Sequence, residues 1–170
     1  MAHSVPSPKA DAACWRRIDR RLLAVLVDER KVLMSKYEEL RTVLSNERFL
    51  LEALNDLGYS PEVSPAGLSL YGYLGDERPE KANIVIRRGQ LNSASNDIGF
   101  ARDGNGVYRA LISEYDKGIG FDDIWLGRIA QTYKERQTMA VAKAKGYRFL
   151  GRQVVETQAG KKVQLRFAVR

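Results

Sequence analysis

Residues 122–146 read DDIWLGRIAQTYKERQTMAVAKAKG, and this stretch decides how the rest of the chain is interpreted. Its apolar side chains recur at helical spacing, at Trp125, Ile129, Tyr133, Ala140 and Ala144. An aspartate at position 122 or 123 can cap the first turn, and a glycine at 146 can end the last one. The stretch therefore predicts a long helix over residues 124–145 with one buried face.

A second, shorter helix is expected earlier in the chain. Asn46 is a suitable N-cap, apolar residues follow at helical spacing from Phe49 to Leu57, and Gly58 is a suitable terminator. Apolar and β-branched runs predict strands over residues 68–73, 84–86, 98–101, 107–111, 148–155 and 162–169. The sequence Asp-Gly-Asn-Gly at 103–106 predicts a tight hairpin between two of these strands.

The order of these elements indicates the fold class. Helix, four strands, helix and two strands fit an α+β domain. We expect a mostly antiparallel sheet packed on one side by the long C-terminal helix and the shorter helix.

The chain divides into an N-terminal extension, residues 1–33, and a single α+β domain, residues 34–170. Two prolines and small residues predict a loose tail over 1–13, and apolar residues at helical spacing among arginines predict a basic helix over 15–33. Met34 also opens a plausible protein start. We therefore hypothesise that translation begins at Met34, which the intact mass of the native protein would test.

Composition excludes several classes of function. The chain has one cysteine and one histidine, so an internal disulfide, a zinc cluster and a multi-histidine metal centre are all excluded. We expect no metal, no cofactor and no catalytic triad built on His3. The longest strongly apolar run has six residues, Leu22–Val27, far fewer than the ~20 that cross a bilayer. We expect no membrane span and a cytoplasmic location, and the sequence leaves the oligomeric state open.

Charge is distributed unevenly along the chain. Residues 34–127 hold 10 basic and 15 acidic residues, a net charge of −5, whereas residues 128–170 hold 11 basic and 2 acidic residues, a net charge of +9. A basic surface of this kind attracts acidic proteins or phosphate backbones. The candidate partner-binding residues are the basic residues of the last two strands: Arg148, Arg152, Lys161, Lys162, Arg166 and Arg170.

Residues 34–170 contain a series of short motifs. They are Met34-Ser35, residues 50–59 (LLEALNDLGY), residues 84–87 (IVIR), and Asp97, Ile98, Gly99, Phe100, Tyr108, Gln131, Tyr133, Ala142, Gly146 and Tyr147. In these motifs and their order the chain resembles a known family of unknown function, the one that includes the conserved plastid and cyanobacterial reading frame thirty-five. The resemblance implies a small intracellular protein whose gene often lies near that of an AAA-type ATPase or a ferredoxin-like protein. It brings no activity, so the roles of Asp97, Gly99, Phe100, Tyr108, Gln131, Tyr133 and Gly146 are not assigned.

The leading interpretation is a non-enzymatic accessory or adaptor protein that binds a protein partner, with an AAA-type ATPase as the candidate. The alternative is a nucleic-acid-binding protein that uses the basic C-terminal helix and hairpin. A third interpretation is an enzyme with an unfamiliar site near Asp97 and Tyr133, which a deep pocket joining the two groups would favour.

Overall fold

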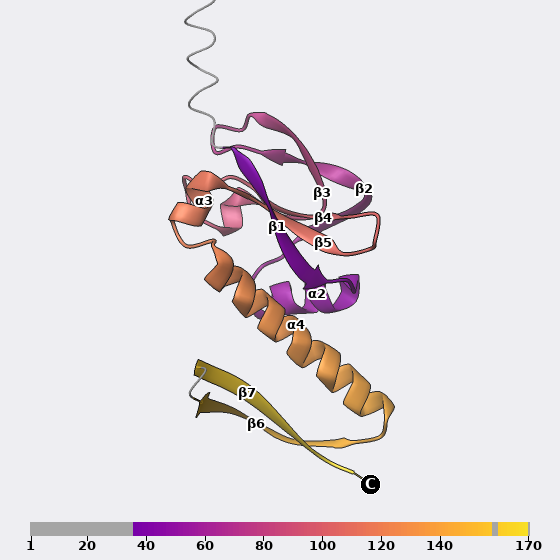
Figure 1. The fold of residues 1–170 in the computed structure, drawn as a ribbon. Coiled ribbons are helices and arrows are strands. Elements are labelled where there is room, and N and C mark those ends of the chain that lie inside the picture. The colour runs from indigo at the N-terminus through magenta and orange to yellow at the C-terminus, as the bar shows by residue number, and fades with distance from the viewer. Residues whose placement is uncertain (1–35, 158–159, 170) are drawn as a thin grey trace, which may run out of the picture. The chain divides into compact units, whose positions relative to one another are not determined.

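The computed structural model describes residues 36–157 and 160–169. Strands and helices follow in the order shown in Figure 1. They are β1 (Tyr37–Leu44), α2 (Glu47–Asp56), β2 (Glu62–Tyr71), β3 (Glu77–Ile86), the 3-10 turn η1 (Arg88–Gln90), β4 (Ile98–Arg102), β5 (Tyr108–Ser113), α3 (Glu114–Gly118), α4 (Asp123–Ala144), β6 (Arg148–Thr157) and β7 (Gly160–Ala168). The helix predicted over 15–33, Cys14, His3 and Arg170 lie outside the described residues.

Five strands form an antiparallel sheet in the order β1-β5-β4-β3-β2. Four of them follow one another along the chain as a meander, and β1 joins the free edge of β5. The α+β class is confirmed, with the long and the short helix on one side of the sheet (Figure 1). The last two strands were expected to extend this fold, but they form a separate two-stranded sheet, β6-β7.

The main core lies between the sheet and the two helices. Alternate residues of the central strands, such as Ile98 and Phe100 on β4, face the helices because successive side chains of a strand point to opposite faces. From α4, the predicted residues Trp125, Ile129 and Tyr133 are buried. The prediction was wrong for the end of the helix, where Ala144 is exposed, Ala140 is only partly buried and Ala142 is buried instead. The N-caps are also as predicted: Asn46 accepts from the Phe49 N–H, and Asp122 accepts from the N–H groups of residues 124 and 125.

The opposite face of the sheet carries a smaller core, made by the β2–β3 ribbon. A bulge between Val63 and Leu68, with Gly67 at φ +85°, changes the register of β2. Leu70 and Ala82 then lie against Gly99 of β4, and all three lie away from the helices. Gly99 has no side chain because the space is already filled: a Cβ there would stand 2.6 Å from the Ala82 Cβ.

This close approach gives a stability prediction. Gly99→Ala should cost about 1–3 kcal/mol of the free energy of unfolding, because the Ala82 Cβ is fixed to the backbone and cannot move aside. Gly127→Ala is the matched control: a Cβ at this exposed position in α4 meets nothing within 4 Å, so we expect a gain of about 0.5–1 kcal/mol from helix propensity. Urea denaturation measures both. Equal stabilities for the two variants would contradict this packing.

Candidate functional site

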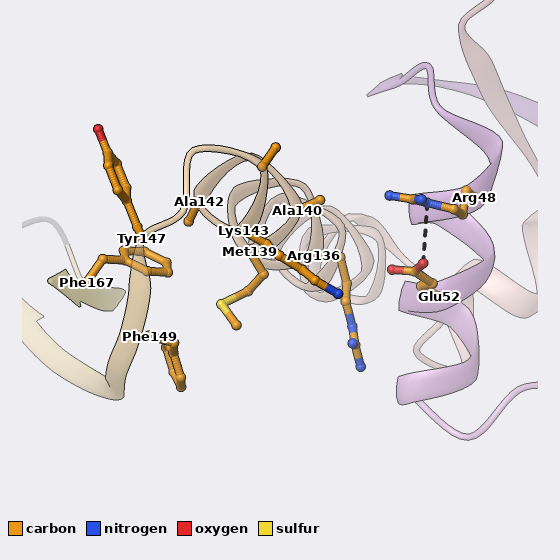
Figure 2. A pocket seen from close by; sticks show the side chains of 11 residues that line it. Arg48, Glu52, Arg136, Met139, Ala140, Ala142, Lys143, Tyr147, Phe149 and Phe167 are labelled. Atoms are coloured by element: carbon orange, nitrogen blue, oxygen red, sulfur yellow. Dashed lines mark ion pairs between the residues drawn. The ribbon is translucent and has the colours of Figure 1, made fainter. Parts of the chain in front are cut away.

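The last two strands form a hairpin beside the second half of α4, and we call the space between them the helix–hairpin groove. One hollow there has a volume of about 900 Å³ and is also lined by two residues of α2. Its apolar floor includes Met139 and Ala142 of α4 with Phe149 and Phe167 of the hairpin. Figure 2 shows Met139 extending from α4 toward the strands that carry the two phenylalanines. Two further hollows, of about 480 and 230 Å³, lie in the same space, and Val163 or Leu165 of the hairpin contributes to their lining.

Strand register divides the hairpin into two unlike faces. Cross-strand partners share a face, so Phe149 with Phe167 and Val154 with Val163 lie on the face that is turned to α4. The two phenylalanine rings pack together, with centroids 5.7 Å apart. None of the described hairpin residues is buried, and Val154 is 54% exposed. The apolar face of the hairpin is therefore only partly covered by α4.

The predicted basic residues are distributed over both faces. Arg148, Lys162 and Arg166 share the outer face by their register. Arg152 and Lys161 lie on the groove face, where each has a carboxylate close by, Glu135 and Glu156 respectively. The structure thus places three of the six along one face and two on the other, and Arg170 lies outside the described residues.

A double hydrogen bond attaches the hairpin to α4. Arg152 donates from Nε and Nη2 to the two carboxylate oxygens of Glu135, at 2.8 and 3.1 Å. This contact with Arg152 holds the pKa of Glu135 below its ordinary value, against the effect of partial burial. Gln131, one of the family-motif residues, donates to the same carboxylate at 3.3 Å. Gln131 therefore helps to orient the group that holds the hairpin.

Most other family-motif residues serve the fold. Phe100 is buried and stacks on Trp125, and Gly146, at φ +74°, ends α4. The Tyr108 hydroxyl donates to Glu47 Oε2 at 2.7 Å. The pKa of Tyr108 is raised to about 12, mainly because the hydroxyl is buried and also because it donates to the Glu47 carboxylate. The Tyr133 hydroxyl accepts from the backbone N–H groups of residues 45 and 46 at 3.4 and 3.1 Å.

Asp97 is the family-motif residue with the most polar contacts. Its side chain is 2% exposed, and both carboxylate oxygens are engaged. Oδ1 accepts from the Arg88 backbone N–H at 2.8 Å, whereas Oδ2 accepts from Arg87 Nη1 at 2.8 Å and from the Tyr71 N–H at 3.0 Å. Its backbone carbonyl accepts from the Tyr37 hydroxyl at 2.6 Å. Asp97 therefore joins the end of β2 to the turn after β3.

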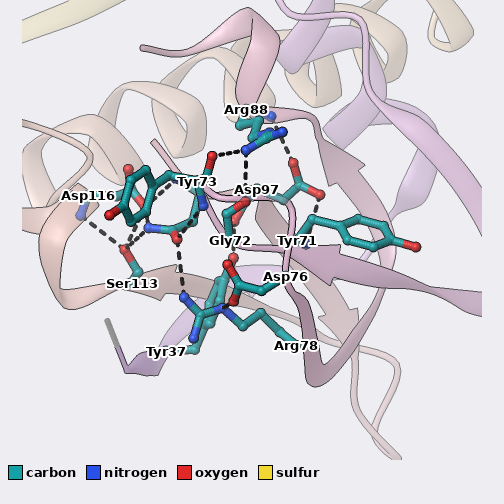
Figure 3. A network of polar contacts seen from close by, with 11 residues as sticks. Tyr37, Tyr71, Gly72, Tyr73, Asp76, Arg78, Arg88, Asp97, Ser113 and Asp116 are labelled. Atoms are coloured by element: carbon teal, nitrogen blue, oxygen red, sulfur yellow. Dashed lines mark hydrogen bonds and ion pairs between the residues drawn. The ribbon is translucent and has the colours of Figure 1, made fainter. Parts of the chain in front are cut away.

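A second buried polar cluster lies next to Asp97 (Figure 3). Asn96 donates from Nδ2 to Ser113 Oγ at 2.8 Å and to Asp116 Oδ2 at 2.9 Å, and its Oδ1 accepts from the Tyr73 N–H at 3.2 Å. Sequence reasoning missed this cluster. The available signal was Ser113-Glu-Tyr-Asp116, a capping pattern that opens the short helix α3.

Asp97 and Tyr133 do not form a common site. Tyr133 contacts the start of α2 from α4, whereas Asp97 contacts β2 and the turn after β3, and no described residue bonds to both. Asp122 is used as a helix cap, as its position predicted. Within the described residues, no group of three His, Cys, Asp or Glu could hold a metal ion. In that part of the chain, no helix combines the length and apolar character needed to cross a membrane.

Comparison with known proteins identifies a family. A family model described as "Protein of unknown function (DUF1257)" matches residues 53–165, about two thirds of the chain. The matched segment begins within α2 and ends within β7, so it includes most of the sheet, all of α4 and the helix–hairpin groove. No curated protein and no solved structure matches the chain.

The Asp97 contacts predict a large loss of stability on truncation. Asp97→Ala should lower the free energy of unfolding by about 3 kcal/mol, because it leaves a partly buried guanidinium and two backbone N–H groups without their acceptor. Asp103→Ala is the control, since Asp103 also accepts from two backbone N–H groups and an arginine but lies in an exposed turn. In urea denaturation, Asp103→Ala should lower the free energy of unfolding by less than half as much as Asp97→Ala does. A smaller effect for Asp97 than for Asp103 would contradict the described role.

The Glu135 contact predicts that hairpin attachment depends on pH. Because the pKa of Glu135 is lowered in the folded state, its stabilisation is present above the ordinary glutamate value and is lost as the pH falls through the lowered pKa. Hydrogen-exchange protection of the β6 amides should therefore decrease severalfold, relative to the β4 amides, between about pH 7 and about pH 3. Glu135→Gln should remove the pH dependence. The same pH dependence in both proteins would exclude Glu135 as its cause.

Proposed function

We propose that this chain, which belongs to the DUF1257 family of proteins of unknown function, is a non-enzymatic accessory protein that binds a protein partner through the helix–hairpin groove. The observation that carries the proposal is the uncovered apolar face of the hairpin. Phe149 and Val154 stand opposite α4 and are 43% and 54% exposed. Groups of exposed apolar side chains on a soluble domain are typical of interaction sites.

The geometry of the hairpin supports this use. A two-stranded sheet is marginally stable by itself and gains stability when a second layer covers its apolar face. Here α4 provides only part of that layer. A hollow of about 900 Å³ lies open along α4 and is lined by the hairpin phenylalanines and by Arg48 and Glu52 of α2. An apolar segment of a partner would complete the layer and bury the phenylalanine pair.

The charges around the groove favour an acidic partner. Several cations at the end of α4 and along the hairpin have no carboxylate within ion-pair distance among the described residues. They are Lys143, Lys145, Arg148, Lys162 and Arg166. By contrast, Arg136 at the groove is already paired with Asp56. The partner we propose therefore presents an apolar segment flanked by aspartate or glutamate. An AAA-type ATPase is our candidate, because the family resemblance implies that such a gene often lies nearby.

A nucleic acid is the second candidate, and one observation favours it. By strand register, Arg148, Lys162 and Arg166 share the outer face of the hairpin. Phosphate groups bind such a row of cations with a strong dependence on salt. The two candidates use opposite faces of the same hairpin, so substitutions can separate them.

The groove proposal predicts a specific loss of binding. Val154→Asp should weaken capture of the purified AAA-type ATPase encoded nearest to this protein's gene by at least about tenfold, because it places a charge on the apolar face. Val43→Asp is the matched control, since Val43 is an exposed valine on β1, 67% exposed, and lies in the other sheet. Binding is measured by affinity capture at near-physiological salt. No capture by the parent protein, or equal capture by both variants, would overturn the proposal.

Reversing the outer-face charges tests the alternative. The triple variant Arg148→Glu, Lys162→Glu and Arg166→Glu should abolish a salt-sensitive gel shift with duplex or single-stranded nucleic acid if that face binds phosphates. Val154→Asp should leave that shift unchanged. Absence of any shift with the parent protein would exclude the nucleic-acid alternative.

A further inference from the structure

Arg88 is held in a fixed position in η1, just after β3. Its backbone N–H donates to Asp97 Oδ1, as described above. The two N–H groups of its Nη1 are directed to backbone carbonyls, one at Gly72 at 3.0 Å and the other at Tyr73. Figure 3 shows this guanidinium next to the turn after β2. Arg88 therefore braces the turn and is itself oriented by it.

The other edge of the same guanidinium is free. Nε and Nη2 carry three N–H groups that have no acceptor among residues 36–157 and 160–169. These two nitrogens form the side-on fork that binds a carboxylate through two parallel hydrogen bonds. Nη2 lies 3.7 Å from the position that a Cβ on Gly75 would take, and Gly75 and Arg88 line the same pocket. The free edge thus lies at a pocket of about 460 Å³.

The other charges of this pocket are already matched. Arg87 donates to Glu62 at 2.6 and 2.8 Å and to Asp97 at 2.8 Å. Asp97 has both oxygens engaged by the contacts described above. Among the lining residues, Arg88 is therefore the one whose charge has no opposite charge within ion-pair distance in the described part of the chain.

The aromatic residues beside the pocket offer contact surface. Tyr71 lines it and is 39% exposed, and Tyr73 in the following turn is 48% exposed. Hydrogen bonds from the backbone N–H groups of Tyr71 and Tyr73 to the side chains of Asp97 and Asn96 hold the backbone of both residues in place. The Arg87 guanidinium lies over the Tyr71 ring, 5.7 Å from its centroid. A tyrosine ring held in this way is typical of binding sites, because little entropy is lost when a ligand packs on it.

We propose that this pocket binds a carboxylate, which the Nε–Nη2 edge of Arg88 holds through two hydrogen bonds while the body of the ligand packs on Tyr71. One guanidinium matches the single negative charge of a carboxylate. A phosphate monoester carries more charge and generally needs further cations or several backbone N–H groups. The site lies on the sheet, and it is independent of the helix–hairpin groove, so either proposal can fail without the other.

Titration with small acids tests the site. Benzoate and N-acetylphenylalanine are added to the full-length protein labelled with ¹⁵N, and the amide signals of Gly75 and Gly89 and the Arg88 Nε signal are followed by NMR. We expect saturable shifts with both acids. N-acetylphenylalanine amide, which lacks the charge, should bind at least about tenfold more weakly than N-acetylphenylalanine. Tighter binding of benzoate indicates a small metabolite as the natural source of the carboxylate, and tighter binding of N-acetylphenylalanine indicates the C-terminus of a polypeptide.

Two variants remove the site in different ways. Arg88→Gln deletes the fork, and Gly89→Leu fills the pocket while leaving Arg88 and its bonds in place, because a Cβ at Gly89 meets nothing within 4 Å. Both should weaken benzoate binding at least about tenfold, with unchanged spectra for the helix–hairpin residues. Undiminished binding by the Gly89 variant, equal binding of the neutral amide, or tighter binding of phenyl phosphate than of benzoate would overturn the proposal.

Discussion

The burial of Trp125, Ile129 and Tyr133 in the main core, against the sheet and α2, is the contact on which the other features depend. It fixes the first half of α4, and a helix of 22 residues is long enough, at ~1.5 Å per residue, to continue well beyond that contact. The second half provides one wall of the helix–hairpin groove and carries Glu135, which holds Arg152. The position of the hairpin is thus set by apolar packing in a different part of the helix.

The polar cluster around Asp97 and Asn96 has a comparable effect at the other end of the sheet. Buried polar groups contribute little net stability, but a carboxylate with both oxygens hydrogen-bonded, such as that of Asp97, restricts the backbone around it to one arrangement. Here the restricted backbone is the turn from Gly72 to Asp76, whose carbonyls in turn orient Arg88. A carboxylate buried within the domain therefore determines which edge of a neighbouring arginine remains available.

The sequence predicted the elements that have strong local signals. Asn46, Asp122, Gly58 and Gly146 mark helix ends as expected, and the Asp-Gly-Asn-Gly turn joins β4 to β5. It did not predict β1, because Tyr37–Leu44 is rich in charged residues and buries little beyond its two ends. The sequence also could not show that β6 and β7 form a sheet separate from the main one. Alternation of apolar and polar residues shows which face of a strand is packed, but it does not show which strands lie beside it.

The same limit applies to the candidate sites. Six basic residues near one another in the sequence were treated as one surface, but strand alternation puts Arg152 and Lys161 on one face and Arg148, Lys162 and Arg166 on the other. The hairpin that carries them has no buried residue among those described, so the core imposes few requirements on its sequence. Mutations can accumulate there without unfolding the domain. On the proposed function, substitutions in this one appendage would therefore alter partner binding while the five-stranded sheet and its core stay unchanged.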